Sequence, residues 1–334
     1  MKICIDNYPF LVNPKTGPYI FLRRLSNCIN NNFKDISISS RYSPFYEIGI
    51  FSTTNKSLYK KPYILRLDGL FIDALNTKYN SKQRNKEIFE SAKQSSGLIF
   101  VSEYCKNIYE KLFGKLSLPF RIINNGVPLE QFEKKDENLR KKLNIDDNQF
   151  VIISSASWRR HKRLEETLKF FKILKKELNN LVLIILGKID EKVEIIKDKD
   201  IIFGGQVKDK DLSKWYNTAN LYLHLAWIEP NSNSQAEAIA SNLPSLCANN
   251  GGNHELVTKA DGGIVSQCDS LVEYGLIDYY NPPEPNYEIL KKDFFNIFNN
   301  YNFFQNKIIR KNIDIRNSSK DYIKFCNKIY FKNA

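Results

Sequence analysis

Two glutamates in the run IEPNSNSQAEAIASNLPSL, Glu229 and Glu237, are separated by seven residues and are spaced to act on one ligand. The run ANLYLHLAWI before them predicts a buried strand, and the short polar residues at 231–233 predict a helix start. We therefore expect Glu229 in a strand-to-helix loop and Glu237 about two turns into the helix. Open α/β sheets bind ligands, above all phosphates, where strand ends face helix N-termini. Two carboxylates there can hold sugar or ribose hydroxyls while the helix end binds phosphate.

Taken alone, the pair also fits a structural role, in which Glu229 caps the helix and Glu237 faces solvent. Three neighbouring segments favour a ligand site. The first is SASWRRHKRL (155–164), which places Arg159, Arg160 and Lys162 at a predicted helix N-terminus. These cations can bind a diphosphate, since arginine offers a fork of donors and lysine a point charge. A solvated basic turn is the alternative for this segment.

The other two segments are rich in glycine. Gly205 ends a predicted strand in FGGQV, so the backbone as far as Val207 can approach a nucleobase edge. In ANNGGNHELV, Gly251 and Gly252 precede a polar helix start and form a turn suited to an anion. A plain turn that binds nothing is the alternative for each segment.

Strand and helix signals alternate along the whole chain, which predicts a doubly wound α/β fold. The apolar runs are nearly continuous, as expected for parallel strands buried on both faces. The predicted strands span 2–6, 35–39, 63–67, 97–101, 120–124, 150–156, 181–187, 200–205, 221–227, 243–248 and 262–266. A polar stretch at 133–149 predicts a domain boundary, and NPPEPN (281–286) is a second break. We expect domains at 1–140 and 141–300 and a helical segment at 301–334.

The net charge of +13 is uneven, because residues 1–135 carry +10 and the remainder +3. Such a field favours an anionic partner, although composition alone explains it equally well. The six cysteines form no CxxC pair, which favours a reducing compartment over a structural zinc. No N-terminal signal peptide and no apolar run near the ~20 residues of a membrane span is visible. We therefore expect a cytoplasmic protein, with peripheral attachment at the inner membrane face as a further expectation.

The order of these segments resembles the C-terminal domain of the family 4 retaining glycosyltransferases, the glycosyl transferases group 1. The shared pattern is a basic strand end with Lys162, a Gly–Val strand end, E-x7-E, Pro244 and GG-x-x-E. In the N-terminal half, VSEYCKNIYEKLFG (101–114), IINNGVPLEQF (122–132) and LRLDG (65–69) are similar to segments of the same family. The resemblance covers roughly residues 1–265. It implies a GT-B fold: two Rossmann-like domains that face each other across a cleft, with C-terminal helices packing back toward the N-terminal domain.

The resemblance also implies a role for each matching residue. Glu237 would hold the ribose hydroxyls of a sugar nucleotide, and Glu229 would face the donor sugar. Lys162, with Arg159 or Arg160, would neutralise the departing diphosphate. The remaining donor contacts implied are the amides of Asn233 and Ser234, the backbone at Gly205 and Val207, and Gly17, which stands where the family has a glycine pair.

Some positions depart from the family. The usual arginine five residues before the lysine is Ser157 here, and Pro-Asn-Ser-Asn replaces the usual Gly-Phe-Gly after Glu229. The family's N-domain histidine has no counterpart, so Asp68 is expected to contact the sugar or acceptor in its place. A turn partner for Arg66 is the alternative role of Asp68.

The resemblance implies an enzyme that moves a sugar from a nucleotide-sugar to a glycan or lipid-linked acceptor, retaining the anomeric configuration, with no metal and no other cofactor. Its partners would be that donor, that acceptor and an anionic membrane surface, but not nucleic acid. Two D-x-D patterns, 198–200 and 209–211, fit helix or strand ends better than a metal site. The alternatives are a basic nucleic-acid- or membrane-binding α/β protein and a GT-B sugar-nucleotide epimerase.

Overall fold

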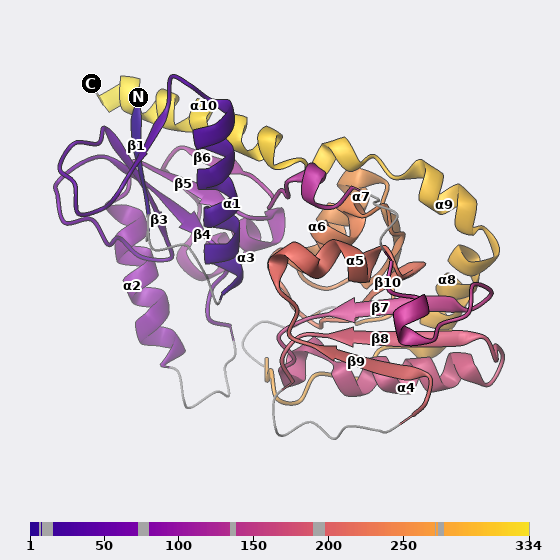
Figure 1. Cartoon of the computed structure of the whole chain (residues 1–334). Coiled ribbons are helices and arrows are strands. Elements are labelled where there is room, and N and C mark those ends of the chain that lie inside the picture. Colours follow the sequence, from indigo (N-terminus) through magenta and orange to yellow (C-terminus); the bar gives the residue numbers. More distant parts are fainter. Residues whose placement is uncertain are drawn as a thin grey trace.

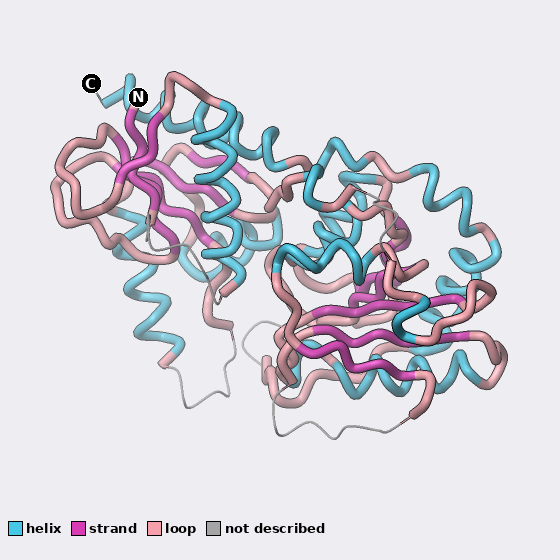
Figure 2. The backbone as a smooth tube through the Cα atoms, in the orientation of Figure 1, coloured by secondary structure: helices cyan, strands magenta, loops and turns pink. Residues whose placement is uncertain are grey.

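The computed structural model of the chain shows two α/β domains side by side (Figure 1). It describes residues 1–6, 8, 16–72, 80–133, 138–189, 198–270, 272 and 277–333. The described strands form two six-stranded sheets, and every neighbouring pair of strands is parallel. Figure 2 shows the two sheets as separate groups of strands, each with helices around it. The predicted parallel α/β architecture is confirmed.

The N-terminal sheet has the strand order β2-β1-β3-β4-β5-β6. Its strands are β1 (Lys2–Ile5), β2 (Ser37–Ser39), β3 (Ile48–Ser52), β4 (Tyr63–Leu67), β5 (Gly97–Phe100) and β6 (Phe120–Ile122). Its helices are α1 (Gly17–Asn32), α2 (Ser81–Lys93) and α3 (Glu103–Phe113). Alternate strand residues point to opposite faces, so Ile50 packs with α1 while Phe51 packs in the cluster that holds α2 and α3. The sheet is therefore buried on both faces.

The C-terminal sheet has the order β12-β11-β10-β7-β8-β9. Its strands are β7 (Phe150–Ser155), β8 (Leu181–Leu186), β9 (Ile201–Gly205), β10 (Leu221–His224), β11 (Ser245–Ala248) and β12 (Gly263–Ser266). The helices in this half are α4 (Leu164–Lys175), α5 (Leu212–Tyr216), α6 (Asn233–Ala240), α7 (Asn253–Ala260), α8 (Tyr287–Asn299) and α9 (Tyr301–Lys307). Helices α4 and α8 cover one face, and α5, α6 and α7 the other. Short 3-10 helices lie at Leu129–Gln131, Lys141–Leu143, Arg160–Lys162, Asp209–Asp211 and Arg310–Ile313.

The last helix, α10 (Ile315–Asn333), returns to the N-terminal domain, where it lies along α1 (Figure 1). Tyr322, Phe325 and Ile329 are buried in the same cluster as Phe21 of α1. The expectation that the C-terminal helices pack back onto the first domain is confirmed. Among the described residues, no helix is long and apolar enough to cross a membrane.

Two local expectations were wrong. The sequence did not predict β3, because Gly49 and the polar residues on either side of IGIFS obscure a strand that is buried throughout. Helix α6 begins at Asn233, with Ser232 as its N-cap, so Glu237 lies one turn into the helix rather than two. This shorter distance brings Glu237 closer to the helix N-terminus and to the facing domain.

The two domains contact each other through polar side chains. Both oxygens of Glu255 on α7 accept backbone N–H groups at the start of α3, from Glu103 and Tyr104, each at 3.0 Å. The same carboxylate accepts Asn124 Nδ2 at 3.1 Å. An acidic residue at a helix N-terminus satisfies free amides and matches the helix dipole. Glu255 thus caps a helix of the opposite domain.

Candidate functional site

Glu229 lies in the loop between β10 and α6, as expected, and it is held by two basic groups. Lys162 Nζ lies 2.6 Å from its Oε1, and His224 Nε2 lies 3.1 Å from its Oε2. Burial alone would raise the pKa of Glu229, but Lys162 and His224 outweigh burial and hold that pKa well below its usual range. The side chain is therefore an ionised carboxylate, and the structural alternative of a helix cap is wrong, because Ser232 occupies the cap.

The glycine pair Gly251–Gly252 holds this loop in place. The Gly252 amide donates to the Glu229 carbonyl at 2.7 Å. A Cβ on Gly251 would lie 2.5 Å from the Glu229 carbonyl oxygen, and one on Gly252 would lie 2.0 Å from the Pro230 carbonyl oxygen. Only glycine fits so close to another backbone. The close approach that the two glycines permit here is to the backbone of Glu229 and Pro230, and their approach to a ligand stays a prediction.

Glu237 is buried, so the alternative in which it faces solvent is wrong. Its Oε1 accepts from Arg24 Nη2 at 2.7 Å, and its Oε2 accepts from the hydroxyl of Tyr216 at 3.1 Å. Burial raises the pKa of Glu237, and the attraction of Arg24 opposes this rise. Glu237 therefore meets a cation that comes from the other domain.

Arg24 projects from α1 and also reaches Asp209, at 3.0 Å from Asp209 Oδ1. Burial would lower the pKa of Arg24, but Glu237 and Asp209 outweigh burial and raise it. The adjacent Arg23 forms an ion pair with the other oxygen of Asp209. These two arginines join α1 to the 3-10 helix before α5 and to α6, at the carboxyl ends of the C-terminal strands.

The N-terminus of α6 faces the start of α1. Asn233 Nδ2 donates to the carbonyl of Gly17 at 2.9 Å, and Asn233 Oδ1 accepts Asn125 Nδ2 at 3.0 Å. The hydroxyl of Ser234 donates to the Ser155 carbonyl at 2.9 Å, so it is committed to the end of β7. The free amides of a helix N-terminus and its dipole favour anions. The first turn of α6 thus presents anion-binding backbone at the domain interface.

The basic turn after β7 divides into separate roles. Arg159 is exposed and forms no ion pair with any residue that the structure describes. Arg160 pairs with Glu166 on α4 at 2.6 Å, and Arg163 is buried against Asp269 with two hydrogen bonds of 3.0 and 2.9 Å. Lys162 alone of the four cations binds Glu229. The alternative of a wholly solvated turn is therefore wrong.

Comparisons with known proteins concern the segment that holds these residues and the fold of the whole chain. Residues 135–274, which include Lys162, Glu229 and Glu237, match the family model described as Glycosyl transferases group 1. This part of the chain therefore resembles the glycosyl transferases group 1 family. The chain is 25% identical over 167 residues to an alpha-monoglucosyldiacylglycerol synthase of Streptococcus pneumoniae. The alignment covers 46% of this chain and 37% of that protein. The chain spans about a third to a half of the length of the curated relatives that it matches.

Solved structures show the fold of the whole chain. A sucrose-phosphate synthase from Thermosynechococcus elongatus superposes with a TM-score of 0.73 at 12% identity, covering 99% of each chain. The Anabaena protein HepE in complex with UDP-glucose gives a TM-score of 0.66 at 13% identity, covering 98% of this chain and 99% of that one. The fold is therefore GT-B, as the sequence resemblance implied.

The segment that matches this family also contains the glycine expected near a nucleobase. Gly205 ends β9 with a φ of +64°, and a Cβ there would meet nothing within 4 Å. Val207 packs against the core cluster beneath α5 and α6. The backbone between Gly205 and Val207 therefore has open space on one side and a packed side chain at Val207, an arrangement compatible with hydrogen bonds from this backbone to a ligand.

Asp68, in the N-terminal domain, is bound from two sides. Arg66 forms an ion pair with it, and the hydroxyl of Ser52 donates to its Oδ2 at 2.7 Å. Arg66 also donates to Asn125 Oδ1 at 2.7 Å, and the Asn125 amide donates to Asn231 Oδ1 at 2.9 Å. Asp68 is thus a partner of Arg66, as the alternative role for this residue predicted. This contact connects Asp68 to the loop that carries Glu229.

Three residues that contact Glu229 or Glu237 were missed by sequence reasoning. His224 had a signal, since it is the one imidazole in the otherwise apolar and aromatic run LYLHLAW. Tyr216 and Arg24 had none, because a tyrosine and an arginine in helices are ordinary. Their importance follows only from the approach of α1 and α5 to Glu237.

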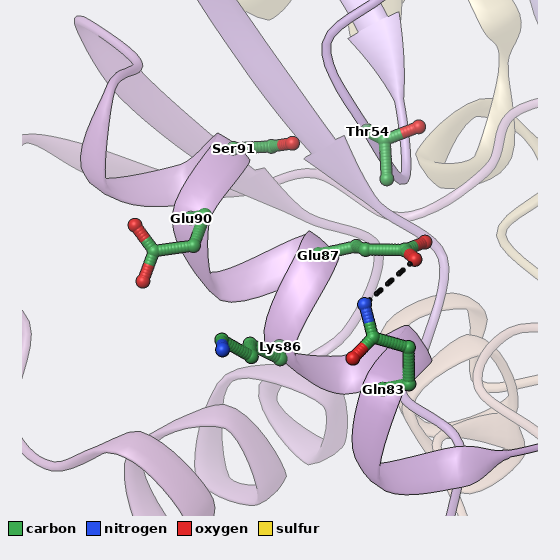
Figure 3. Close-up of a pocket in the computed structure, with 6 residues that line it drawn as sticks. All are labelled: Thr54, Gln83, Lys86, Glu87, Glu90 and Ser91. Carbon is green, nitrogen blue, oxygen red and sulfur yellow. Dashed lines mark hydrogen bonds between the residues drawn. The ribbon is translucent and has the colours of Figure 1, made fainter.

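A separate open hollow of about 380 Å³ lies beside α2 and is shown in Figure 3. It is lined by Thr54, Gln83, Lys86, Glu87, Glu90 and Ser91. Its lining comes entirely from the N-terminal domain, and Gln83 and Glu87 hydrogen-bond to each other at 3.2 Å. It includes none of the residues that the motifs predict, so it is not the candidate site.

Proposed function

We propose that the protein is a retaining glycosyltransferase that moves a sugar from a nucleotide-sugar to a glycan or lipid-linked acceptor without a metal ion. One observation carries the proposal: Glu229 and Lys162 are in contact at 2.6 Å, near the N-terminus of α6, while Glu237 lies one turn further along that helix. A nucleotide-sugar has a diol, a diphosphate and a sugar in sequence. This arrangement offers a group for each.

Glu237 accepts the ribose hydroxyls, because a buried carboxylate is a strong acceptor. Lys162 and the exposed Arg159 bind the diphosphate, together with the amides of Asn233 and Ser234 at the helix start. Arg160 supports this turn through Glu166. Glu229 faces the sugar, and the backbone at Gly205 and Val207 contacts the base. Gly17 contributes through its contact with Asn233, which fixes the entrance to α6.

In the reaction, the bond between the sugar C1 and the diphosphate oxygen breaks, and a bond from C1 to the acceptor oxygen forms on the same face. The departing diphosphate takes the proton of the acceptor hydroxyl. Charge develops on the diphosphate, where preorganised cations and helix amides stabilise it most directly. Lys162, Arg159 and the α6 terminus supply this stabilisation without a metal. Asp68, tied to the Glu229 loop through Asn125, orients the acceptor side.

The acceptor side belongs to the N-terminal domain, which carries the excess positive charge. The loops at 40–47 and 53–62 connect parallel strands without a helix, and they expose Tyr42, Phe45 and Leu58, at 53%, 75% and 60%. Arg41 and the exposed Lys60 lie in the same loops. Apolar side chains flanked by cations favour an anionic membrane surface. We place a lipid-linked acceptor at this surface.

Two experiments test the proposal. Purified protein is incubated with UDP- and GDP-sugars and with lipid and glycan acceptors, with and without EDTA, and the product anomer is read by NMR. Transfer with retention, unaffected by EDTA, is expected. Inversion, loss of transfer with EDTA, or epimerisation of the donor without an acceptor would contradict it.

For the membrane surface, sedimentation with phosphatidylglycerol vesicles compares the wild type with Phe45→Ser/Leu58→Ser. The double variant should bind several-fold more weakly. Leu112→Ser removes another exposed side chain, at 46%, from helix α3 rather than from these loops, and should bind as the wild type does. Equal binding by all three proteins would contradict the membrane contact.

A further inference from the structure

Arg24 is buried with most of its hydrogen-bonding capacity unused. Its side chain is only 3% exposed, and both of its ion pairs, to Glu237 and Asp209, use the same nitrogen, Nη2. Neither Nε nor Nη1 has a hydrogen-bond partner among the residues that the structure describes. A buried donor without a partner is destabilising, so such groups need an explanation.

The free donors of Arg24 lie beside a carboxylate that can still accept. Glu237 Oε1 accepts one bond, from Arg24, and Oε2 accepts one, from Tyr216. Each carboxylate oxygen has two lone pairs, so each keeps one acceptor position. Donors and acceptors without partners thus occur side by side at one point of the domain interface.

A vicinal diol matches this combination. Each of its hydroxyls donates one hydrogen bond and accepts others. The carboxylate of Glu237 can take the two protons, while Arg24 Nε and Nη1 donate to the two oxygens. A lone carboxylate would satisfy only half of the hydrogen bonds of such a diol.

We propose that Arg24 is a donor-binding residue contributed by the N-terminal domain, which donates to the ribose hydroxyls that Glu237 accepts. The inference rests on the proposed function. It extends the donor site from the C-terminal domain to α1, so the nucleotide itself joins the two domains. Arg23 has no part in this contact, because its ion pair is with Asp209 and its side chain is 20% exposed.

Isothermal titration with UDP and GDP first identifies the nucleotide that the wild type binds. That nucleotide and its 2′,3′-dideoxy analogue are then titrated into the wild type, Arg24→Met and Arg23→Met. Arg24→Met should weaken the binding of the natural nucleotide by about 10- to 100-fold, as expected when hydrogen bonds from a charged group are lost. It should change the affinity for the dideoxy analogue by less than about threefold, since no diol remains to be bound.

Arg23→Met is the matched control, because it removes an ion pair between the same helices but leaves Glu237 untouched. It should keep the wild-type ratio of the two affinities. Arg24→Lys, which keeps the charge and offers a single donor group, should give an intermediate ratio and guards against a misfolded methionine variant. Thermal melts confirm that each variant is folded.

Three results would overturn the inference. An equal loss of affinity for both ligands in Arg24→Met would indicate a purely structural ion pair, and tighter nucleotide binding would make Arg24 a competitor of the ribose. An unchanged ratio of the two affinities would overturn it as well. In these cases Glu237-dependent binding would still support the proposed function. Absence of any nucleotide binding by the wild type would instead overturn the proposed function.

Discussion

Lys162 Nζ and Glu229 Oε1 lie 2.6 Å apart, although they come from different strand ends of the C-terminal sheet. Both side chains are mostly buried, at 14% and 19% exposed, and His224 binds the second oxygen of the carboxylate. The pair keeps a cation and an anion ready at the site with little reorganisation. Removal of Glu229 would leave Lys162 without this partner, whereas removal of Lys162 would leave Glu229 with His224 alone.

Replacing Lys162 by methionine should lower kcat by about 10²- to 10³-fold, the cost of losing one preorganised group at a developing charge. The pKa of Glu229 should rise at the same time, because the main group that lowers it is gone. Steady-state kinetics with the donor varied measures the effect. Lys175→Met removes a partner of Asp200, at 2.8 Å, away from the site and serves as the control. A kcat within threefold of the wild type for Lys162→Met would refute its role.

Gly251→Ala should lower kcat by at least about tenfold, because its Cβ would lie 2.5 Å from the Glu229 carbonyl oxygen and would displace the loop. The left-handed backbone at Gly251, φ +82°, adds a strain of about 1–2 kcal/mol. Gly114→Ala also places a Cβ at a positive φ, +86°, but this Cβ meets nothing within 4 Å. The control should therefore lose stability without losing kcat. Equal activity of the two variants would show that the Glu229 loop tolerates displacement.

The residues that face one another within the C-terminal domain could be predicted from the sequence, because each follows a strand and parallel strands end at the same sheet edge. Lys162, Glu229 and Glu237 are recognisable in this way. Arg24 was not, because it lies 213 positions from Glu237 and reaches it only through the docking of two domains. The contact of Gly251 with the Glu229 loop was also missed, since a glycine indicates a position without room for a side chain but not which neighbouring backbone fills that room. Residue type alone likewise could not separate Arg160, bound to Glu166, from the exposed Arg159.

Glu255→Ala should loosen the contact between the domains. The change removes a carboxylate that accepts two amides of α3 across the interface, a loss of about 0.5–2 kcal/mol by comparison with other helix caps. The melting temperature should fall by a few degrees, and small-angle scattering should report a larger radius of gyration. Ser102→Ala removes a cap of the same helix from within its own domain, where Ser102 accepts the Cys105 amide at 3.1 Å. It should lower stability without changing the radius, and an equal radius for both variants would argue against the interdomain role.

His161 should make the protein less stable as the pH falls. Burial, together with Lys162 and Arg159 and against the attraction of Glu229, lowers the pKa of His161 to about 3. An unfolded histidine has a pKa of about 6.5, so between these values the unfolded state binds the extra proton. Its contribution is fully present above pH 6.5 and is lost toward pH 3, by up to about 2 kcal/mol between pH 7 and 5.

His161→Phe keeps a ring to stack on Tyr279, whose centroid lies 4.6 Å from that of His161, but it cannot titrate. Urea unfolding at pH 7, 6 and 5 should show a smaller loss of unfolding free energy in this variant than in the wild type. Parallel pH dependence in the two proteins would mean that His161 is not the responsible group.

The most direct test of the donor site is isothermal titration of UDP and GDP into the wild type, Glu237→Gln and the control Glu110→Gln, which alters a surface ion pair with Lys106 on α3. The glutamine keeps the shape of Glu237 but loses the charge that attracts the ribose hydroxyls. One nucleotide should bind the wild type and the control alike, and Glu237→Gln should bind it about 10- to 100-fold more weakly. Binding of neither nucleotide by the wild type, or equal affinity in Glu237→Gln, would contradict a nucleotide-sugar site built on Glu237.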